Sequence, residues 1–201
     1  MKSPLLFPEE KVLQEVILPD LDKGRKGFDR LHTEAVVHWM KKICESVPLL
    51  EERVLVTAAY AHDWGYFGMF PKRTTLDTVT ARKEAHARIG AKKIGALLRT
   101  RLKKVFSEQE IKRIQHLVFV HDKLGELSAD DEIAIMEADT LGALDTTIVR
   151  PTYSAEDNKR YIDEQVLKLR RPLFRHKLAI EVFEEVLERR REFYRRKASK
   201  S

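Results

Sequence analysis

The chain contains 201 residues, of which 43% are hydrophobic and 35% charged, and its basic residues exceed its acidic residues to give a formal charge of +6. This composition is that of a globular protein and excludes a disordered or fibrous chain, and at this length one core is favoured over two. The positive charge favours anionic partners but is too small for a nucleic-acid-binding signature. We therefore expect one domain over residues 1–201, with nucleic acid an unlikely partner.

The chain offers no sign of secretion or membrane insertion. Cys44 is the single cysteine, so an intramolecular disulfide is excluded. Pro4 and Pro8 interrupt the short apolar run near the N-terminus, which therefore does not resemble a signal peptide. Nowhere do about eighteen apolar residues follow one another, as a membrane-spanning helix requires. We expect a cytoplasmic protein that does not enter a membrane.

Apolar residues recur at helical spacing along almost the whole chain, and strand-like alternation is absent. Glycine and proline clusters divide the chain into about six or seven helices, with breaks at 24–27, 48, 65–78, 125–129 and 151–154. The sequence therefore predicts an all-α fold.

Several boundaries of these helices follow from local signals. An amphipathic segment spans 79–105. Ser107 and Glu110 form a capping-box pattern that starts the next helix, and Ser128 is expected to open the one after it in the same way. Residues of about 154–197 are expected to form a C-terminal helical extension packed outside the bundle.

The basic C-terminal tail permits two interpretations. Six cations, Arg189, Arg190, Arg191, Arg195, Arg196 and Lys197, would suit nucleic acid or an acidic surface. Glutamates interleave with them at helical spacing, which is typical of an ordinary solvated helix that ends in cations. We favour the solvated helix.

Histidines and aspartates stand out at five places on or beside apolar helical segments: His32, His62-Asp63, His86, His121 and Asp139. Imidazole and carboxylate together suit Mn, Fe, Co, Ni or Zn, whereas Mg prefers all-oxygen ligand sets. Adjacent side chains diverge by about 100° on a helix, so His62 and Asp63 converge only near a helix end, which Gly65 predicts. The pattern indicates a transition-metal site.

The ordered set resembles the HD superfamily of metal-dependent phosphohydrolases. The resemblance runs from about residue 32 to 144 and rests on DRLHTEAVVHWM, TAAYAHDWG, EAHARIGAKKIGALL, IQHLVFVHD and EADTLGAL. It implies an HD-domain helical bundle whose metal-binding core covers about residues 28–147.

The resemblance also implies the metal ligands. A first metal would be bound by His32, His62, Asp63 and Asp139. In members with a second metal, Asp63 bridges and residues matching His86 and His121 complete the site. We expect one firmly bound divalent metal. A second metal is the alternative for the number of ions, and Mg is the alternative to a transition metal.

The other histidines are read as helix-surface or core residues, namely His38, His116 and His176. Of these His116 competes with His121 for the functional position, and the apolar residues before His121 favour His121.

By the same resemblance the reaction is the hydrolysis of a phosphate ester, in which hydroxide on the metal attacks phosphorus. Asp63, His86 and His121 are then the catalytic residues. Lys72 and Arg73 lie on the loop after the His-Asp pair and are candidates to bind the substrate phosphate, with a solvated loop tip as the alternative.

Three branches of the superfamily fit the sequence less well. Tyr66 stands where cyclic-dinucleotide phosphodiesterases carry Lys, and Tyr66-Phe67 replaces the acidic pair of alarmone hydrolases. The additional histidines of deoxynucleoside triphosphate triphosphohydrolases are absent between 64 and 85. The expected substrate is a nucleotide or another small phosphate ester. The alternative is a non-catalytic, metal-dependent nucleotide sensor, and a homo-oligomer stays open.

Overall fold

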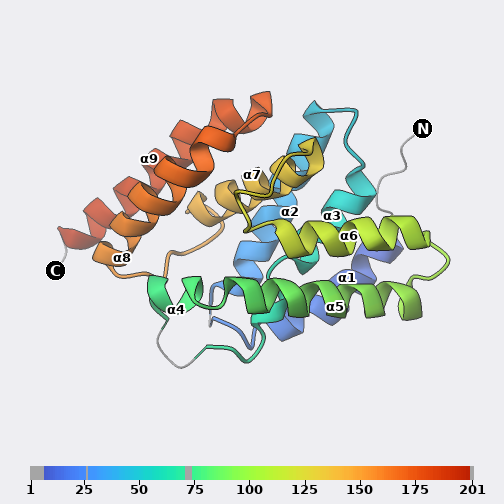
Figure 1. The fold of residues 1–201 in the computed structure, drawn as a ribbon. Coiled ribbons are helices and arrows are strands. Elements are labelled where there is room, and N and C mark those ends of the chain that lie inside the picture. The colour runs from blue at the N-terminus through green and yellow to red at the C-terminus, as the bar shows by residue number, and fades with distance from the viewer. Residues whose placement is uncertain (1–6, 26, 71–73, 200–201) are drawn as a thin grey trace.

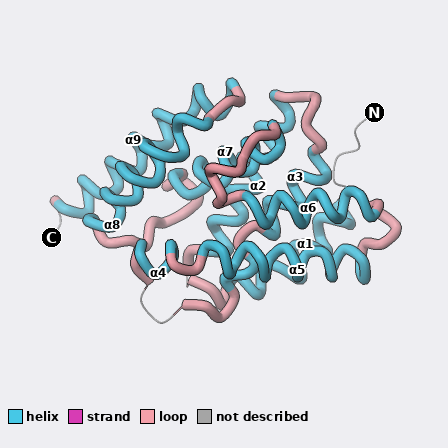
Figure 2. Tube along the Cα trace, in the orientation of Figure 1, coloured by secondary structure: helices cyan, strands magenta, loops and turns pink. Residues whose placement is uncertain are grey.

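The computed structural model describes residues 7–25, 27–70 and 74–199 (Figure 1). Within these ranges helices are joined by turns and no strand occurs, which confirms the all-α class (Figure 2). The α-helices are α1 (Phe7–Leu21), α2 (Asp29–Ser46), α3 (Glu52–Ala61), α4 (Leu76–Thr80), α5 (Lys83–Arg101), α6 (Glu108–Val120), α7 (Asp130–Leu144), α8 (Ala155–Arg160) and α9 (Lys177–Ala198). The other helical segments are the 3₁₀ turns η1 (Trp64–Tyr66) and η3 (Arg171–Leu173) and the π-helix η2 (Tyr161–Arg170).

Helices α2 and α7 cross at the centre of the bundle, with α3 packed on α2 and α6, and α5 beside α6 (Figure 1). The crossing requires a glycine, because a Cβ at Gly142 would lie 2.9 Å from the backbone nitrogen of Val36. Asp139 lies about one turn before Gly142, and His32 one turn before Val36. The close approach of the two helices therefore brings His32 and Asp139 together.

The structure confirms one predicted helix start and corrects another. The Ser107 hydroxyl accepts from the Glu110 N–H, and the Glu110 carboxylate accepts from the Ser107 N–H, as in a capping box. At α7, however, Ala129 occupies the N-cap position, and the Glu132 carboxylate accepts from the N–H groups of both Ser128 and Ala129. An acidic side chain inside the first turn thus replaces the serine cap that the sequence indicated.

A further expectation about the helices differs from the structure. The amphipathic segment expected over 79–105 is interrupted between Thr80 and Lys83, where α4 ends and α5 begins. The C-terminal extension packs against α2 and α7, and its Ile162, Val166 and Phe183 belong to the same buried apolar cluster as these helices. Among the described helices, none combines the length and the apolar content that crossing a membrane requires.

Candidate metal centre

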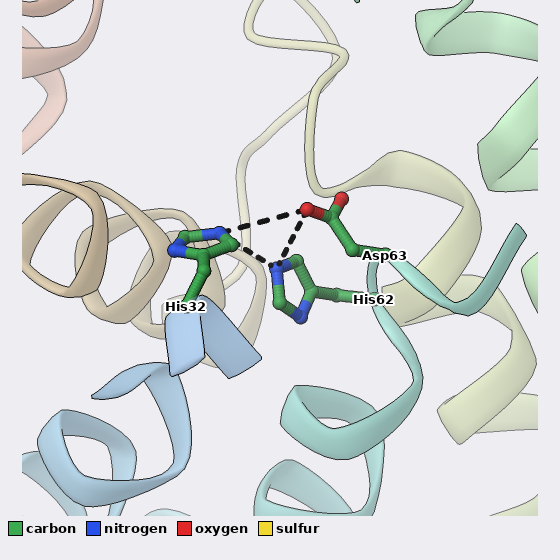
Figure 3. A group of neighbouring side chains, drawn as sticks. All are labelled: His32, His62 and Asp63. Carbon is green, nitrogen blue, oxygen red and sulfur yellow. Dashed lines mark hydrogen bonds and ion pairs between the residues drawn. The ribbon is translucent and has the colours of Figure 1, made fainter. Parts of the chain in front are cut away.

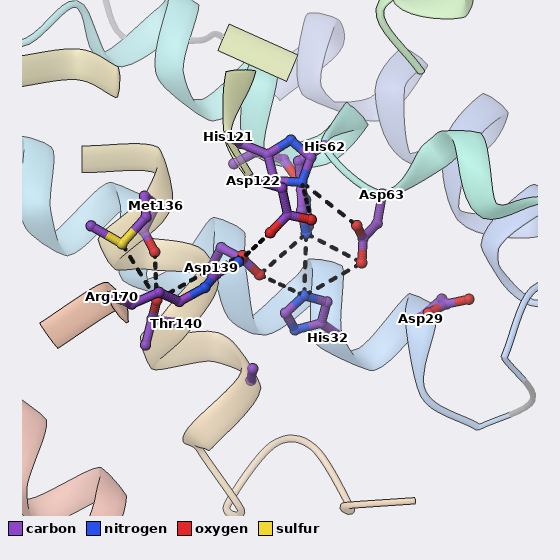
Figure 4. Close-up of polar contacts among 12 residues, drawn as sticks. Asp29, His32, His62, Asp63, His121, Asp122, Met136, Asp139, Thr140 and Arg170 are labelled. Carbon is purple, nitrogen blue, oxygen red and sulfur yellow. Dashed lines mark hydrogen bonds and ion pairs between the residues drawn. The ribbon is translucent and has the colours of Figure 1, made fainter. Parts of the chain in front are cut away.

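Four of the predicted ligands converge from three helices on one buried point. His32 comes from α2 and the adjacent His62 and Asp63 come from the end of α3 (Figure 3), and Asp139 comes from α7 (Figure 4). The Nε2 atom of His32 lies 3.2 Å from His62 Nε2, 3.0 Å from Asp139 Oδ1 and 3.6 Å from Asp63 Oδ2. His62 Nε2 lies 3.6 Å from Asp63 Oδ2 and 3.7 Å from Asp139 Oδ1. We call these four residues the first ligand group.

A second group faces the other oxygen of Asp63. His86 Nε2 from α5 and His121 Nε2 from the end of α6 lie 3.4 and 3.9 Å from Asp63 Oδ1. The carboxylate of Asp122, which the sequence reasoning missed, lies near both rings, with Oδ2 3.9 Å from His86 Nε2 and 3.7 Å from His121 Nε2. We call Asp63, His86, His121 and Asp122 the second ligand group.

The backbone explains how the adjacent His62 and Asp63 point to one place. Helix α3 ends at Ala61, His62 keeps a helical conformation, and Asp63 departs from it with φ −101° and ψ 4°. The predicted helix end is thus present, but Gly65 is not its left-handed cap, because the glycines with positive φ among the described residues are Gly27 and Gly68. Gly65 instead permits close packing, since a Cβ there would lie 1.9 Å from the carbonyl oxygen of His86.

Backbone carbonyls orient the imidazole rings. The Nδ1–H groups of His62 and His121 donate to the carbonyl oxygens of Ala59 at 2.8 Å and Val118 at 2.7 Å. Each Nε2 atom is therefore left to face the centre, as in metal-binding histidines. Burial lowers the pKa of His121 to about 4, so this ring is neutral at pH 7.

The donor set fits a divalent cation. The Nδ1–H of His86 donates to the carbonyl oxygen of Arg82 at 3.3 Å, so in the neutral form of both rings the Nε2 atoms of His86 and His121 carry lone pairs. These two atoms are 3.3 Å apart, and in that form they would have no proton to share. A cation between them would relieve that repulsion, and nitrogen and carboxylate oxygen are together the donors of transition-metal sites.

Neighbouring groups keep the carboxylates of the centre ionised. Burial opposes ionisation of Asp63, but the facing His62 and His86 rings and the Arg25 guanidinium hold the pKa of this carboxyl well below its usual range. Burial opposes ionisation of Asp139 in the same way, but Arg170 holds its pKa well below the usual range. Both groups are therefore available as anionic ligands at neutral pH.

Three cations border the centre. Arg25 Nη2 donates to Asp63 Oδ2 at 3.1 Å. Arg170 donates to Asp139 Oδ2 at 2.6 Å and also to Asp122 (Figure 4). Lys83 Nζ donates to Asp122 Oδ1 at 2.9 Å. All three cations line one pocket together with His32, Asp63, Asp122 and Asp139.

Other candidate residues lie elsewhere. His116 is paired with Glu132 at 2.8 Å and its side chain is 44% exposed, so of the two competing histidines His121 is the one near the centre. His176 is buried against Glu137. The proposed phosphate ligands Lys72 and Arg73 lie outside the described residues.

A comparison with protein families shows which family has a matching sequence. The HD domain family matches residues 31–144, more than half of the chain. The chain belongs to the HD domain family. Searches of curated proteins and of solved structures find no match.

The range matched by the HD domain family includes only part of the residues around the centre. All seven residues of the two ligand groups lie within residues 31–144, whereas the pocket residues Arg25 and Arg170 lie outside this range. The sequence did carry a signal for Arg170, because it falls four residues after Val166 and eight after Ile162 on a buried stripe. A charged residue on an apolar stripe indicates a buried polar contact.

Proposed function

We propose that this protein is a metal-dependent phosphohydrolase that acts on a nucleotide or another small phosphate ester. The observation that carries the proposal is the position of Asp63, whose Oδ2 faces the first ligand group while Oδ1 faces the second. A carboxylate in this position suits a centre of two metals, rather than the single metal expected from the sequence. Members of the HD domain family are generally metal-dependent phosphohydrolases, in agreement with this proposal.

The residues that would hold the metals are those of the two ligand groups. When bound, such metals lower the pKa of water and polarise a phosphoryl oxygen, which is the chemistry that phosphate ester hydrolysis needs. The mixed donor set favours Mn, Fe, Co, Ni or Zn over Mg.

The cations around the centre would orient the phosphate. Arg25 and Lys83 reach the centre from different elements, since Arg25 precedes α2 and Lys83 begins α5. A guanidinium and an ammonium at these positions would neutralise the nonbridging oxygens of a phosphoryl group. Arg25 also stacks on the Phe28 ring, with its Cζ 4.4 Å from the ring centroid, which fixes the direction of its guanidinium.

The proposal is tested by metal analysis and phosphate release with one panel of nucleotides and phosphate esters and added Mn, Co or Ni. The parent protein should release phosphate, and Asp63→Asn should lose both metal and turnover. His116→Ala is the matched control, because this half-exposed histidine lies away from the centre, and it should retain both. Ligand binding without turnover by the metal-loaded parent would contradict the enzyme and favour the nucleotide sensor.

A further inference from the structure

Arg190 of α9 carries a buried guanidinium and lines the pocket that contains the metal centre. Its side chain is 1% exposed, and it follows Phe183, Val186 and Leu187 on the buried stripe of the helix. Its Nε–H donates to Asn158 Oδ1 at 2.7 Å, and its Nη1–H donates to the carbonyl oxygen of Ala143. Both acceptors are neutral groups.

No carboxylate offsets the charge of Arg190 within the part of the chain that the structure describes. The aromatic ring of Tyr161, whose centroid lies 5.4 Å from the guanidinium carbon, does not supply a negative charge either. Burial raises the pKa of the Tyr161 phenol to about 12, so this group is neutral at pH 7.

The other two buried arginines of the pocket show the usual arrangement. Arg25 is paired with Asp29 and Asp63, and Arg170 with Asp122 and Asp139. Burial alone would lower their pKa, but these carboxylates raise it. For Arg190 burial prevails and lowers the pKa. An isolated buried charge is costly, and an anion bound beside Arg190 would offset that cost.

Arg190 lines the same pocket as the metal centre. The pocket wall includes His32, Asp63 and Asp139 of the centre together with Arg190 and Tyr153. A molecule seated at the centre would therefore extend toward Arg190 within a single continuous space.

We propose that Arg190 binds a second oxyanion of the substrate, so that the substrate class is a small phosphate ester that carries another phosphate or a carboxylate. This inference rests on the proposed phosphohydrolase function. The guanidinium would bind that oxyanion through its N–H groups while the ester phosphate lies at the metal centre. In this proposal the two ligand groups hold the metals that hydrolyse the ester, and Arg190 determines which phosphate esters bind well.

The test compares three flexible esters of similar size: glycerol 3-phosphate, 3-phosphoglycerate and glycerol 1,3-bisphosphate. The metal-loaded parent should show a kcat/KM at least about tenfold higher for one of the two esters with a second anion, mainly through a lower KM. Preference for the bisphosphate identifies a phosphate as the second group, and preference for 3-phosphoglycerate identifies a carboxylate. Equal kcat/KM values for all three would overturn the inference while leaving the phosphohydrolase proposal intact.

Variants then assign the preference to Arg190. In Arg190→Gln the preference should fall to within about twofold of unity, and Arg190→Lys should restore part of it. Arg189→Gln is the control, because Arg189 neighbours Arg190 on α9 but pairs with Glu185 at the surface, and it should keep the parental preference. A full preference in folded Arg190→Gln would overturn the assignment.

A binding measurement separates the two proposals and does not depend on turnover or on the folding of a variant. Calorimetric titration of the metal-loaded parent should show tighter binding of a doubly anionic ester than of glycerol 3-phosphate. If no ester is hydrolysed but this difference is observed, the phosphohydrolase fails and the oxyanion site stands. If neither turnover nor the difference is observed, both fail.

Discussion

The two charged regions of the pocket differ in how their charges are balanced. At the metal centre, the four buried carboxylates of Asp29, Asp63, Asp122 and Asp139 face three cations, Arg25, Lys83 and Arg170, and imidazole nitrogens face one another. Arg190, by contrast, is surrounded by neutral groups. We call these regions the anionic end and the cationic end of the pocket. A cation bound at the first and an anion bound at the second would offset the cost of burying them.

The largest expected effect concerns the number of metals at the anionic end. His86→Ala/His121→Ala should lower turnover by about a thousandfold, because it removes the two imidazoles of the second ligand group. Metal analysis should give two metals per chain in the parent and one in the variant. One metal in both proteins would restore the single-metal centre expected from the sequence.

A second experiment asks how far cations from the C-terminal region stabilise the anionic end. Arg170→Met should lower the free energy of unfolding of the metal-free protein by about 3 kcal/mol, because it leaves Asp122 and Asp139 without their guanidinium. Urea unfolding with and without metal measures this. The loss should be smaller with metal bound, since the metal charge acts on the same carboxylates. An equal loss in both states would show that the two cations act independently.

The contact between α7, which carries Asp139, and the start of α9, which carries Arg190, should have an intermediate effect on stability. The buried Glu137 of α7 accepts from the backbone N–H of His176 at 3.0 Å and from its ring Nδ1–H at 2.6 Å, just before α9 begins. Glu137→Ala should therefore lower the free energy of unfolding by about 2 kcal/mol. Metal content should stay at the parental value, and its loss would mean that α9 docking controls the centre. Glu184→Ala, at an exposed position of α9, is the control.

The smallest effect concerns pH and the start of α7. Burial opposes ionisation of Glu132, but the N–H groups of Ser128 and Ala129 and the His116 ring lower its pKa to about 2, from 4.5 in the unfolded chain. The stabilisation is therefore present above about pH 4.5 and is lost as the pH falls toward 2. Glu132→Gln should lower the free energy of unfolding by about 1 kcal/mol at pH 7, and by less at pH 3. Urea unfolding at both pH values measures this, and an equal loss would contradict the pKa.

The sequence predicted the anionic end of the pocket much better than the cationic end. Helical periodicity is strong because helices such as α2 and α6 bury one face, and the spacing of His32, His62-Asp63 and Asp139 is a property of the chain itself. Asp122 was missed although it follows His121, because the side chain after a ligand normally points elsewhere on a regular helix. Its position past the end of α6 changes that direction.

The buried roles of Arg25 and Arg190 were missed for a different reason. Arg190 lies in the run EVLERRREFYRR, where charged residues on the exposed face of α9 conceal one on the buried face. Its spacing from Phe183 and Val186 was the available signal. Arg25 lies in a segment interpreted as a break between helices, and its contact with Asp63 depends on how α1 and α2 are joined. Such tertiary contacts have no fixed sequence spacing.

The glycine at the crossing of α2 and α7 also bears on how the protein folds. Gly142 lets two rigid helices meet at a contact that joins position 32 to position 139, so a loop of more than a hundred residues must close before the first ligand group exists. Contacts of such long range are slow to form. The second histidine pair, on the neighbouring helices α5 and α6, is much more local. We therefore expect the first ligand group to form late in folding, so that metal added at the start of refolding would stabilise the completed topology rather than initiate it.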